Sequence, residues 1–387
     1  MLLSRLAAAR GGGTGFVHQK LHVVQKPVMS LNGQCAPFIA VSNRLKQHQN
    51  GVWLTKQGGR KNRDFALPRN SNGRKFMSRM KSIVAGLGLA ALLTTTAAYA
   101  GDPASCKAVR LSDVGWTDIQ ATTGLASVLL TALGYEPQTI QLSVPVTYAS
   151  LKNKDLDVFL GNWMPSMTND IKDYTADGSV ETISTNLTGA GYGIVVPTYV
   201  ADAGVKTLTD LGKFKDKFDG KIYGIEAGND GNRIILDMIK NPKDNLEGFE
   251  LVESSEAGML TQAEQSMKNN EWIAFLGWTP HPVMGAMKIT YLDGMGDSGF
   301  GAATVYTNVR KGYTTECPNA GKFIANLKFN LDMEGQMMDA ILKGGDAQTV
   351  ATDWLKKHPD AIAPWIAGVT TFDGGDAAAA IKTALGS

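Results

Sequence analysis

Residues 107–133 read KAVRLSDVGWTDIQATTGLASVLLTAL, a short apolar run followed by a long one with small residues. The pattern predicts a strand over 107–112 and a helix over 117–133, with Thr117 as N-cap and Gly134 as the stop. A second strand, a helix start and a third strand are predicted next, at 139–144, 147–152 and 156–160. This βαβαβ order predicts an α/β fold with a mostly parallel sheet flanked by helices.

The alternation starts again after a glycine-rich stretch near residue 189. Strands are predicted at 192–196, 221–225, 272–276 and 289–292, helices between them at 208–213, 231–240 and 256–269, and final helices at 315–330, 332–343, 347–357 and 376–385. The glycine-rich stretch and a Pro/Gly-bearing stretch at 280–288 are candidate crossings between two lobes. We expect a discontinuous first lobe, 101–187 with 288–387, and an inserted second lobe, 188–287, with a ligand cleft between them.

Charge divides the chain near residue 100. Residues 1–81 contain 15 Lys or Arg and one acid, and residues 82–100 contain no charged side chain. The remainder contains 23 bases and 35 acids, a net charge of −12. The basic segment at 1–76 has no sustained strand or helix period, so we expect a misassigned upstream extension or a disordered leader. A nucleic-acid-binding arm is the alternative, and we expect no nucleic-acid partner for an exported protein.

Residues 77–100 have the three parts of a secretory signal peptide. A basic start precedes an apolar run over 83–93, and Ala98-Tyr99-Ala100 forms a small-x-small cleavage site. The apolar run is short for a membrane span, although an N-terminal anchor is the alternative interpretation. We expect cleavage after Ala100 and release into the periplasm. Gly101, not cysteine, follows the site, so a lipid anchor is not indicated.

Two cysteines, Cys106 and Cys317, lie in the expected exported part, and Cys35 lies before it. In an oxidising compartment they either pair or remain two buried thiols. The exported part has two histidines, His281 and His358, and no Cys/His cluster with the spacing of a zinc site. We therefore expect no metal and no cofactor.

Three tryptophans, Trp116, Trp163 and Trp278, stand just past the ends of apolar runs, and Tyr192 stands at the start of another. Side chains at strand ends reach the edge of an α/β sheet where ligands bind. Four rings that converge there form an electron-rich cage suited to a quaternary ammonium cation, which has no N–H groups to satisfy. Taken singly, each ring is more commonly a packing residue.

Two polar residues are close enough in sequence to complete such a cage. Asp118 follows Trp116 by two positions, and Asn229 lies in a loop after a predicted strand. Asp118 would balance the positive charge, and both side chains would bind a ligand hydroxyl. Their ordinary alternatives are a helix N-terminus and a turn. An ionised Asp118 would repel the carboxylate of glycine betaine, so we expect choline as the ligand.

The four aromatics occur in stretches that resemble the periplasmic substrate-binding proteins of quaternary-ammonium ABC transporters, the choline-binding members above all. The resemblance covers residues 101–387, and its motifs are at 110–119, 157–165, 186–197 and 275–282. It implies a two-lobe, type II periplasmic-binding fold that closes over its ligand. It also implies a cage of Trp116, Trp163, Tyr192 and Trp278, a hydroxyl site at Asp118 and Asn229, and a Cys106–Cys317 disulfide.

We therefore expect a monomeric solute receptor, not an enzyme, that delivers choline to an ABC transporter permease. A glycine betaine or carnitine receptor is the alternative in the same class. A choline-ester hydrolase that uses His281 is the distant alternative, since the chain has no Gly-x-Ser-x-Gly motif. His281 lies between Pro280 and Pro282 and is more typical of a rigid turn.

Overall fold

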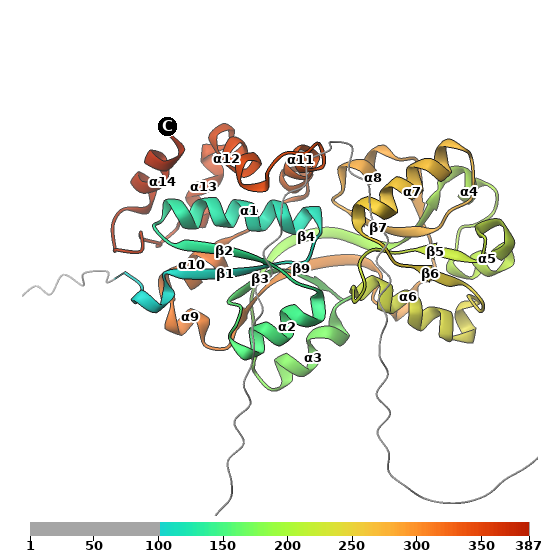
Figure 1. Cartoon of the computed structure of the whole chain (residues 1–387), viewed down its shortest axis with the longest axis horizontal. Helices are drawn as coiled ribbons and strands as arrows, with labels where there is room; N and C mark the ends of the chain where they lie inside the picture. Colours follow the sequence, from blue (N-terminus) through green and yellow to red (C-terminus); the bar gives the residue numbers. More distant parts are fainter. Residues whose placement is uncertain (1–100, 387) are drawn as a thin grey trace, which may run out of the picture. The chain divides into compact units, whose positions relative to one another are not determined.

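The computed structural model describes residues 101–386; the leader expected at 1–76 and the signal peptide expected at 77–100 lie outside the described residues. One mixed sheet of nine strands runs through the described part (Figure 1). The strands are β1 (Ala108–Asp113), β2 (Glu136–Gln141), β3 (Val158–Met164), β4 (Val180–Pro197), β5 (Lys221–Tyr223), β6 (Glu250–Val252), β7 (Phe275–Thr279), β8 (Ile289–Tyr291) and β9 (Gly301–Arg310).

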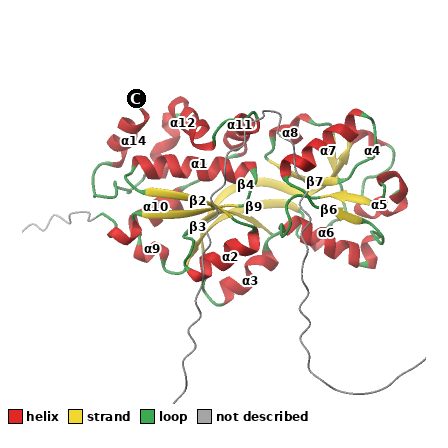
Figure 2. Ribbon diagram, in the orientation of Figure 1, coloured by secondary structure: helices red, strands yellow, loops and turns green. Residues whose placement is uncertain are grey.

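Helices occupy most of the connections between these strands. They are α1 (Thr117–Ala132), α2 (Val144–Asn153), α3 (Thr168–Ala176), α4 (Thr198–Asp202), α5 (Leu208–Lys213), α6 (Asp230–Lys240), α7 (Glu256–Lys268), α8 (Pro282–Ala286), α9 (Tyr313–Glu316), α10 (Pro318–Asn326), α11 (Leu331–Leu342), α12 (Ala347–Lys357), α13 (Ile362–Trp365) and α14 (Ala377–Leu385). Figure 2 shows helices on both sides of the sheet, with α1, α11 and α12 on one side and α2 and α3 on the other. This layering is the α/β arrangement that the sequence predicts.

The sheet has parallel ends and an antiparallel centre. Its strand order is β2-β1-β3-β9-β4-β7-β5-β6, with β8 paired to β4. β1 pairs in parallel with β2 and β3, and β5 pairs in parallel with β6 and β7. The long strands β4 and β9 pair with each other antiparallel and join the two ends. The βαβαβ unit predicted over 107–160 is thus confirmed at one end of the sheet, and a second parallel unit, which includes the unpredicted strand β6, occupies the other end.

The first strand and helix show how the chain positions the site. Val109 and Leu111 of β1 are fully buried in the core, as is Ser112, whereas Ala108 and Arg110 are partly exposed. Trp116, not Thr117, occupies the N-cap position of α1, and its side chain makes no capping bond. Gly134 ends the helix with φ +87°, a conformation that glycine adopts without steric cost. Trp116 is therefore held between the end of a buried strand and the start of a buried helix.

The Cys106–Cys317 disulfide implied by the resemblance is present, with a Cα–Cα distance of 5.6 Å. Both cysteines are buried. Cys106 precedes β1, and Cys317 lies at the junction of α9 and α10. The bond therefore ties the start of the sheet to a segment 211 residues later. The alternative of two free thiols is wrong.

The largest differences from the predicted elements concern the central strands. β4 begins at Val180, twelve residues before the predicted strand start at Tyr192, and β9 was not predicted. Both contain polar and small residues without a clean alternation, so the pairing of distant segments decides their conformation. The helix predicted over 315–330 is two helices, α9 and α10, with Pro318 as the first residue of the second.

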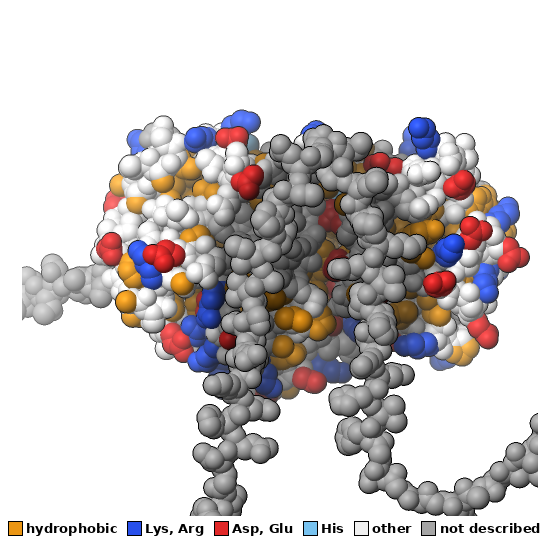
Figure 3. Space-filling view, viewed as in Figure 1, with side chains coloured by type: hydrophobic (Ala, Val, Ile, Leu, Met, Phe, Trp, Pro, Cys, Tyr) orange, Lys and Arg blue, Asp and Glu red, His pale blue; other side chains and the backbone are white. Residues whose placement is uncertain are grey.

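The surface carries both charge signs. On the face in Figure 3, Lys and Arg side chains are interspersed with Asp and Glu over the described residues in view. No helix in the described part of the chain is long and apolar enough to cross a bilayer.

Candidate functional site

A small cavity lies between the two parallel parts of the sheet, beside the ends of β3 and β7. The cavity and its open side together contain about 250 Å³ of space without atoms, a volume that includes open solvent. Its walls are Trp116, Asp118, Trp163, Tyr192, Ile225, Asp230 and Trp278. Five of the six predicted site residues therefore share one cavity wall. Asn229, the sixth, is not part of that wall.

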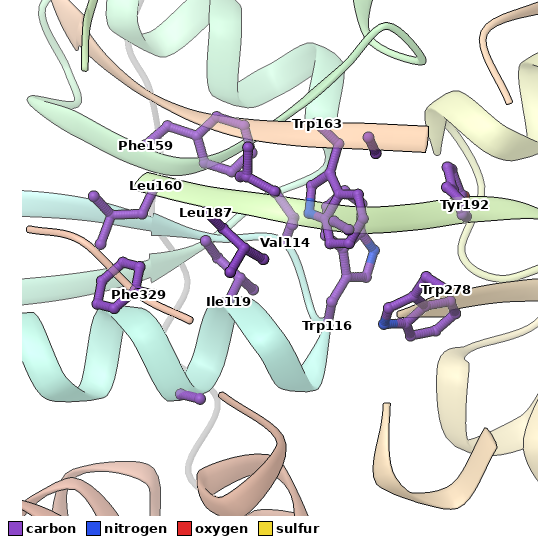
Figure 4. Packing of buried hydrophobic residues seen from close by; sticks show 14 of the residues in the cluster. Val114, Trp116, Ile119, Phe159, Leu160, Trp163, Leu187, Tyr192, Trp278 and Phe329 are labelled. Carbon is purple, nitrogen blue, oxygen red and sulfur yellow. The ribbon is translucent and has the colours of Figure 1, made fainter. Parts of the chain in front are cut away.

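We call Trp116, Trp163, Tyr192 and Trp278 the four-ring cluster. Figure 4 shows Trp116 and Trp163 approaching from one side and Tyr192 and Trp278 from the other. The Trp163 and Tyr192 ring centroids are 6.0 Å apart, and those of Tyr192 and Trp278 are 6.5 Å apart at an interplanar angle of 79°. Each of the four side chains belongs to a residue that is 4–6% exposed. The rings of these pairs are inclined to each other and not stacked, with interplanar angles of 56° and 79°, so they form walls around a space.

The placement of three rings differs in detail from the sequence prediction. Trp163 lies within β3 and Trp278 lies within β7, each as the second-last residue of its strand. Tyr192 lies inside the long strand β4, directly opposite Trp278 in the β4–β7 register. Trp116 alone stands beyond a strand end. Strand ends still explain the site, because β3 and β7 finish at the cavity.

Hydrogen bonds fix the outer edges of three of these rings. The Trp116 indole N–H donates to Glu226 Oε1 at 2.7 Å, and that of Trp163 donates to Asp118 Oδ2 at 3.2 Å. The Tyr192 hydroxyl donates to Asn229 Oδ1 at 3.0 Å. Phe300 packs edge-on against Tyr192 with centroids 5.2 Å apart. Three of the four rings are thus anchored by their polar edges, whereas the buried Trp278 indole N–H has no hydrogen-bond partner among the described residues.

Asp118 and Asp230 bring two buried carboxyl groups to the cavity. Asp118 Oδ1 and Asp230 Oδ2 have no hydrogen-bond partner among the described residues. Burial, with a contribution from the nearby Glu256 carboxylate, raises the pKa of Asp118 to about 7. Burial likewise raises the pKa of Asp230 to about 6. At Asp230 the effect of burial outweighs the favourable charge of nearby Arg233, and no positive group is among the causes that act on Asp118.

Asn229 supports the wall from behind. As the N-cap of α6, its Oδ1 accepts from the Asn232 backbone N–H at 3.1 Å, besides the Tyr192 hydroxyl. Its Nδ2 donates to Asp230 Oδ1 at 3.2 Å. These bonds engage the amide with protein groups and orient Tyr192 and Asp230.

The sequence prediction missed Asp230, which follows Asn229 directly. Asn229 and Asp230 are alternative polar residues in one loop, and the choice depends on where α6 begins. Since α6 begins at Asp230, the capping role falls to Asn229 and the next side chain reaches the cavity. A capping signal, Asn followed by a helical run, was available in the sequence.

The surroundings of the cavity are acidic. Burial raises the pKa of Glu226 to about 7 and holds that of Glu334 well above its ordinary range. No Lys, Arg or His is among the residues that form the cavity wall. Such a site disfavours an anion and attracts a cation, whose charge would offset the buried carboxyl groups.

His281 lies behind the four-ring cluster. Its Nδ1 accepts from the Met284 backbone N–H at 3.3 Å, and its Nε2 is 3.0 Å from Glu256 Oε1. Both ring nitrogens are thus engaged within the protein. This arrangement leaves neither nitrogen free to take a proton from a bound ester.

Comparison with known proteins agrees with a binding site. The family described as the substrate binding domain of ABC-type glycine betaine transport systems matches residues 107–357. A solved structure described as an ABC-transporter choline binding protein in complex with choline is 55% identical. That comparison covers 73% of this chain and 100% of the other, with a TM-score of 0.72. The expected type II periplasmic-binding fold is confirmed.

Two curated relatives match over shorter lengths. Protein ORF1 of Chromohalobacter salexigens is 54% identical over 129 residues, 33% of this chain and 83% of its own. The glycine betaine/carnitine transport binding protein GbuC of Listeria monocytogenes is 29% identical over 165 residues, 43% of this chain and 54% of its own. The chain is a substrate-binding protein and not an enzyme, and it belongs to the family of substrate-binding domains of ABC-type glycine betaine transport systems.

Proposed function

We propose that this protein captures choline in the cavity and delivers it to the permease of an ABC transporter. The observation that carries the proposal is the cavity wall itself, which combines four rings, no basic side chain and two buried carboxyl groups that each have one oxygen without a hydrogen-bond partner. The solved choline complex that is 55% identical to this chain supports the same ligand.

The four-ring cluster would hold the trimethylammonium group. Ring faces carry negative quadrupole charge, and each close contact with a cation contributes about 0.5–2 kcal/mol, more when water is excluded. A methylated nitrogen has no N–H group, so an apolar wall leaves no donor unsatisfied. Ammonium and primary amines would lose hydrogen bonds to water, and the cavity therefore selects against them.

Asp118 and Asp230 would bind the opposite end of choline. Their unpartnered oxygens, Asp118 Oδ1 and Asp230 Oδ2, are acceptors for the ligand hydroxyl and balance its positive charge. Asn229 remains a proposed hydroxyl contact, although its present bonds favour an orienting role for Tyr192 and Asp230. Asp230 is our addition to the ligand-binding set.

Glycine betaine or carnitine is the second candidate. The family description and the name of the GbuC relative favour it. Each of these ligands carries a carboxylate, which would face Asp118 and Asp230 without any basic side chain of the cavity wall to meet it. Two carboxylates that share a buried site repel each other strongly. Choline, with a hydroxyl in that place, avoids the conflict.

Closure between two lobes would complete the site. We assign 101–187 with 288–387 to one lobe and 188–287 to the other, with β4 as the strand that passes between them. On this division Trp116 and Trp163 belong to the first lobe, and Tyr192 and Trp278 belong to the second. A cavity built from both lobes forms when they close, so ligand binding favours the closed state.

Substrate-binding proteins of this class act outside the cytoplasmic membrane, in the periplasm or extracellularly. For this chain we propose the periplasm, after cleavage of the signal peptide at 77–100 behind Ala100. We also propose that it acts as a monomer. N-terminal sequencing of the exported protein tests the cleavage site, and a mature start well before residue 95 contradicts it.

Titration calorimetry with choline, acetylcholine, glycine betaine and carnitine tests the ligand. We expect choline to bind most tightly of the four and to be recovered unchanged after incubation. Tighter binding of glycine betaine than of choline would overturn the role given to Asp118 and Asp230. Release of choline from acetylcholine would overturn the assignment as a receptor.

A further inference from the structure

Glu256 connects two elements that carry rings of the four-ring cluster. It is the first residue of α7, it is 5% exposed, and it is not part of the cavity wall. Its Oε2 accepts from the Thr117 backbone N–H at 2.8 Å, and its Oε1 accepts from Thr117 Oγ1 at 2.7 Å. The same Oε1 is 3.0 Å from His281 Nε2. One buried carboxylate therefore contacts Thr117, 139 positions earlier in the chain, and His281, 25 positions later.

On one side Glu256 completes the start of α1. The N-cap residue Trp116 supplies no side-chain acceptor, so the first N–H groups of this helix need another partner. Glu256 provides that partner at Thr117, and its negative charge is favourable at a helix N-terminus. Thr117 follows Trp116 directly. The bond therefore fixes the backbone that carries one ring of the four-ring cluster.

On the other side Glu256 fixes His281. The His281 Nδ1 accepts from the Met284 N–H as the N-cap of α8, so Nδ1 carries no proton. These partners assign the neutral tautomer with the proton on Nε2, which donates to Glu256. The His281 ring lies edge-on against Trp278, with centroids 4.9 Å apart at 88°. The orientation of His281 thus sets the position of a second ring of the cluster.

We propose that Glu256 is a positioning residue, a brace that holds Trp116 and Trp278 at their closed spacing without contacting the ligand. The proposal rests on the proposed function and on the lobe division, which places Thr117 in one lobe and Glu256 and His281 in the other. A brace between lobes that forms on closure slows ligand release, because the cavity opens only after its bonds break. It leaves the rate of ligand entry into the open form almost unchanged.

The carboxylate is required because Glu256 accepts three hydrogen bonds and donates none. An amide at this position has one acceptor oxygen, and its NH₂ group would point at the Thr117 N–H or at the His281 Nε2–H. Glu256→Gln therefore breaks the brace while it keeps the side-chain volume. Thr117→Val removes one of the three bonds, and His281→Asn keeps a capping side chain for α8 but removes the Nε2 donor.

Stopped-flow tryptophan fluorescence on the full chain measures choline association and dissociation in these variants. We expect Glu256→Gln to raise the dissociation rate about tenfold or more and to change the association rate less than about threefold. Thr117→Val and His281→Asn should raise dissociation by smaller factors. Glu264→Gln, an exposed substitution of the same type on α7, is the matched control and should leave both rates unchanged.

Two readouts separate a brace from a purely structural role. Tetramethylammonium lacks the hydroxyl, so loss of the brace should speed its release by the same factor as that of choline. An unchanged dissociation rate in Glu256→Gln, with an equal fall in melting temperature with and without choline, would overturn the brace.

A further measurement does not depend on any ligand. Nitrogen-15 NMR of the empty protein should show His281, identified by its absence in His281→Asn, as the Nε2–H tautomer. We expect that signal to move in Glu256→Gln and to stay in Glu264→Gln. A His281 signal that is the same in Glu256→Gln contradicts the brace even if choline binds. A protein that binds no choline but shows the expected His281 shift contradicts the proposed function and leaves the Glu256–His281 contact confirmed.

Discussion

Two groups of aromatic side chains in this molecule differ in the spacing of their rings and in the charged groups that lie next to them. The four-ring cluster surrounds a cavity, and its nearest ring pairs have centroids 6.0 and 6.5 Å apart. A second group, Phe214, Phe218 and Trp272, which we call the satellite cluster, packs more tightly. Trp272 lies 5.4 Å from each of the two phenylalanine rings. The rings of the satellite cluster thus pack against one another, and none of them belongs to the wall of the cavity.

The satellite cluster also has a cation from its own chain. Lys217 Nζ lies 4.3 Å from the centroid of the Trp272 ring, and the lysine is exposed. Among the described residues, no lysine belongs to the wall of the cavity that the four-ring cluster surrounds, and this wall contains the buried carboxyl groups of Asp118 and Asp230 instead. We therefore expect an aromatic ring to bind a cationic ligand when the ring is buried, when no lysine of the chain covers its face, and when carboxyl groups lie beside it. Aromatic content alone does not distinguish the two groups.

Replacing one tryptophan in each group is the strongest way to test this comparison. Trp163→Ala removes a ring wall and the indole N–H that donates to Asp118, so we expect choline affinity to fall about a hundredfold or more. Trp272→Ala should lower the melting temperature and leave choline affinity within about twofold. Calorimetry with choline and thermal unfolding of both variants measure these effects. Equal losses of affinity in the two variants would remove the distinction between the groups.

The charge of the four-ring site is tested by Asp118→Asn. The amide has nearly the same shape but no negative charge, so choline affinity should fall about tenfold or more, while glycine betaine loses less or gains. The preference for choline over glycine betaine should therefore narrow. Asp237→Asn, an exposed substitution on α6, is the control and should change neither affinity. Competition calorimetry with both ligands gives the ratio of choline affinity to glycine betaine affinity. A ratio that is the same in Asp118→Asn as in the unchanged protein contradicts the proposed role of Asp118.

The raised pKa values of Asp118, about 7, and Asp230, about 6, predict the pH dependence of binding. A bound cation favours the ionised carboxyl groups, so binding below pH 7 must release protons. We expect choline affinity to be level above about pH 8 and to fall as pH decreases, by up to about tenfold per pH unit for each proton released. In Asp118→Asn the fall between pH 8 and 6 should be smaller. Calorimetry in buffers of different ionisation enthalpy counts the protons.

The same raised pKa values predict that the stability of the empty protein decreases as pH rises, whereas choline affinity increases. Asp118 and Asp230 titrate near their ordinary values when the chain is unfolded, so the folded state binds more protons between about pH 4 and 7. Their contribution to stability is therefore full at low pH and is lost as pH rises through 6 and 7. Saturating choline should raise the melting temperature more at pH 8 than at pH 5.

Sequence reasoning located the rings because strand ends meet at one edge of an α/β sheet, a local signal that needs no knowledge of pairing. Trp116, Trp163 and Trp278 were found in this way, although two of them lie inside their strands by one residue. Asp230 was missed because the loop before α6 offers two polar residues and the helix start decides between them. Glu256 was missed because its partner Thr117 is 139 residues away, and no local pattern marks that contact.

The helices and strands also differ in how well they were predicted, according to whether local signals or distant pairing determine them. Helices such as α7 and α12 were predicted to within a residue, since their apolar period and capping residues are local. Residues 180–191 of β4 and all of β9 were not predicted, because their conformation depends on pairing with each other across more than one hundred residues. Tertiary contacts override weak local preferences in such strands.

The smallest expected effect concerns the lysine of the satellite cluster. Lys217→Gln removes the cation above Trp272, but the lysine is exposed and water screens its contact with the ring. We expect the melting temperature to fall by about 2 °C or less and choline affinity to stay the same. Thermal unfolding and calorimetry on this variant measure both. A loss of choline affinity in Lys217→Gln would mean that the two aromatic groups are coupled, because this cation lies against the satellite cluster and no lysine lines the cavity.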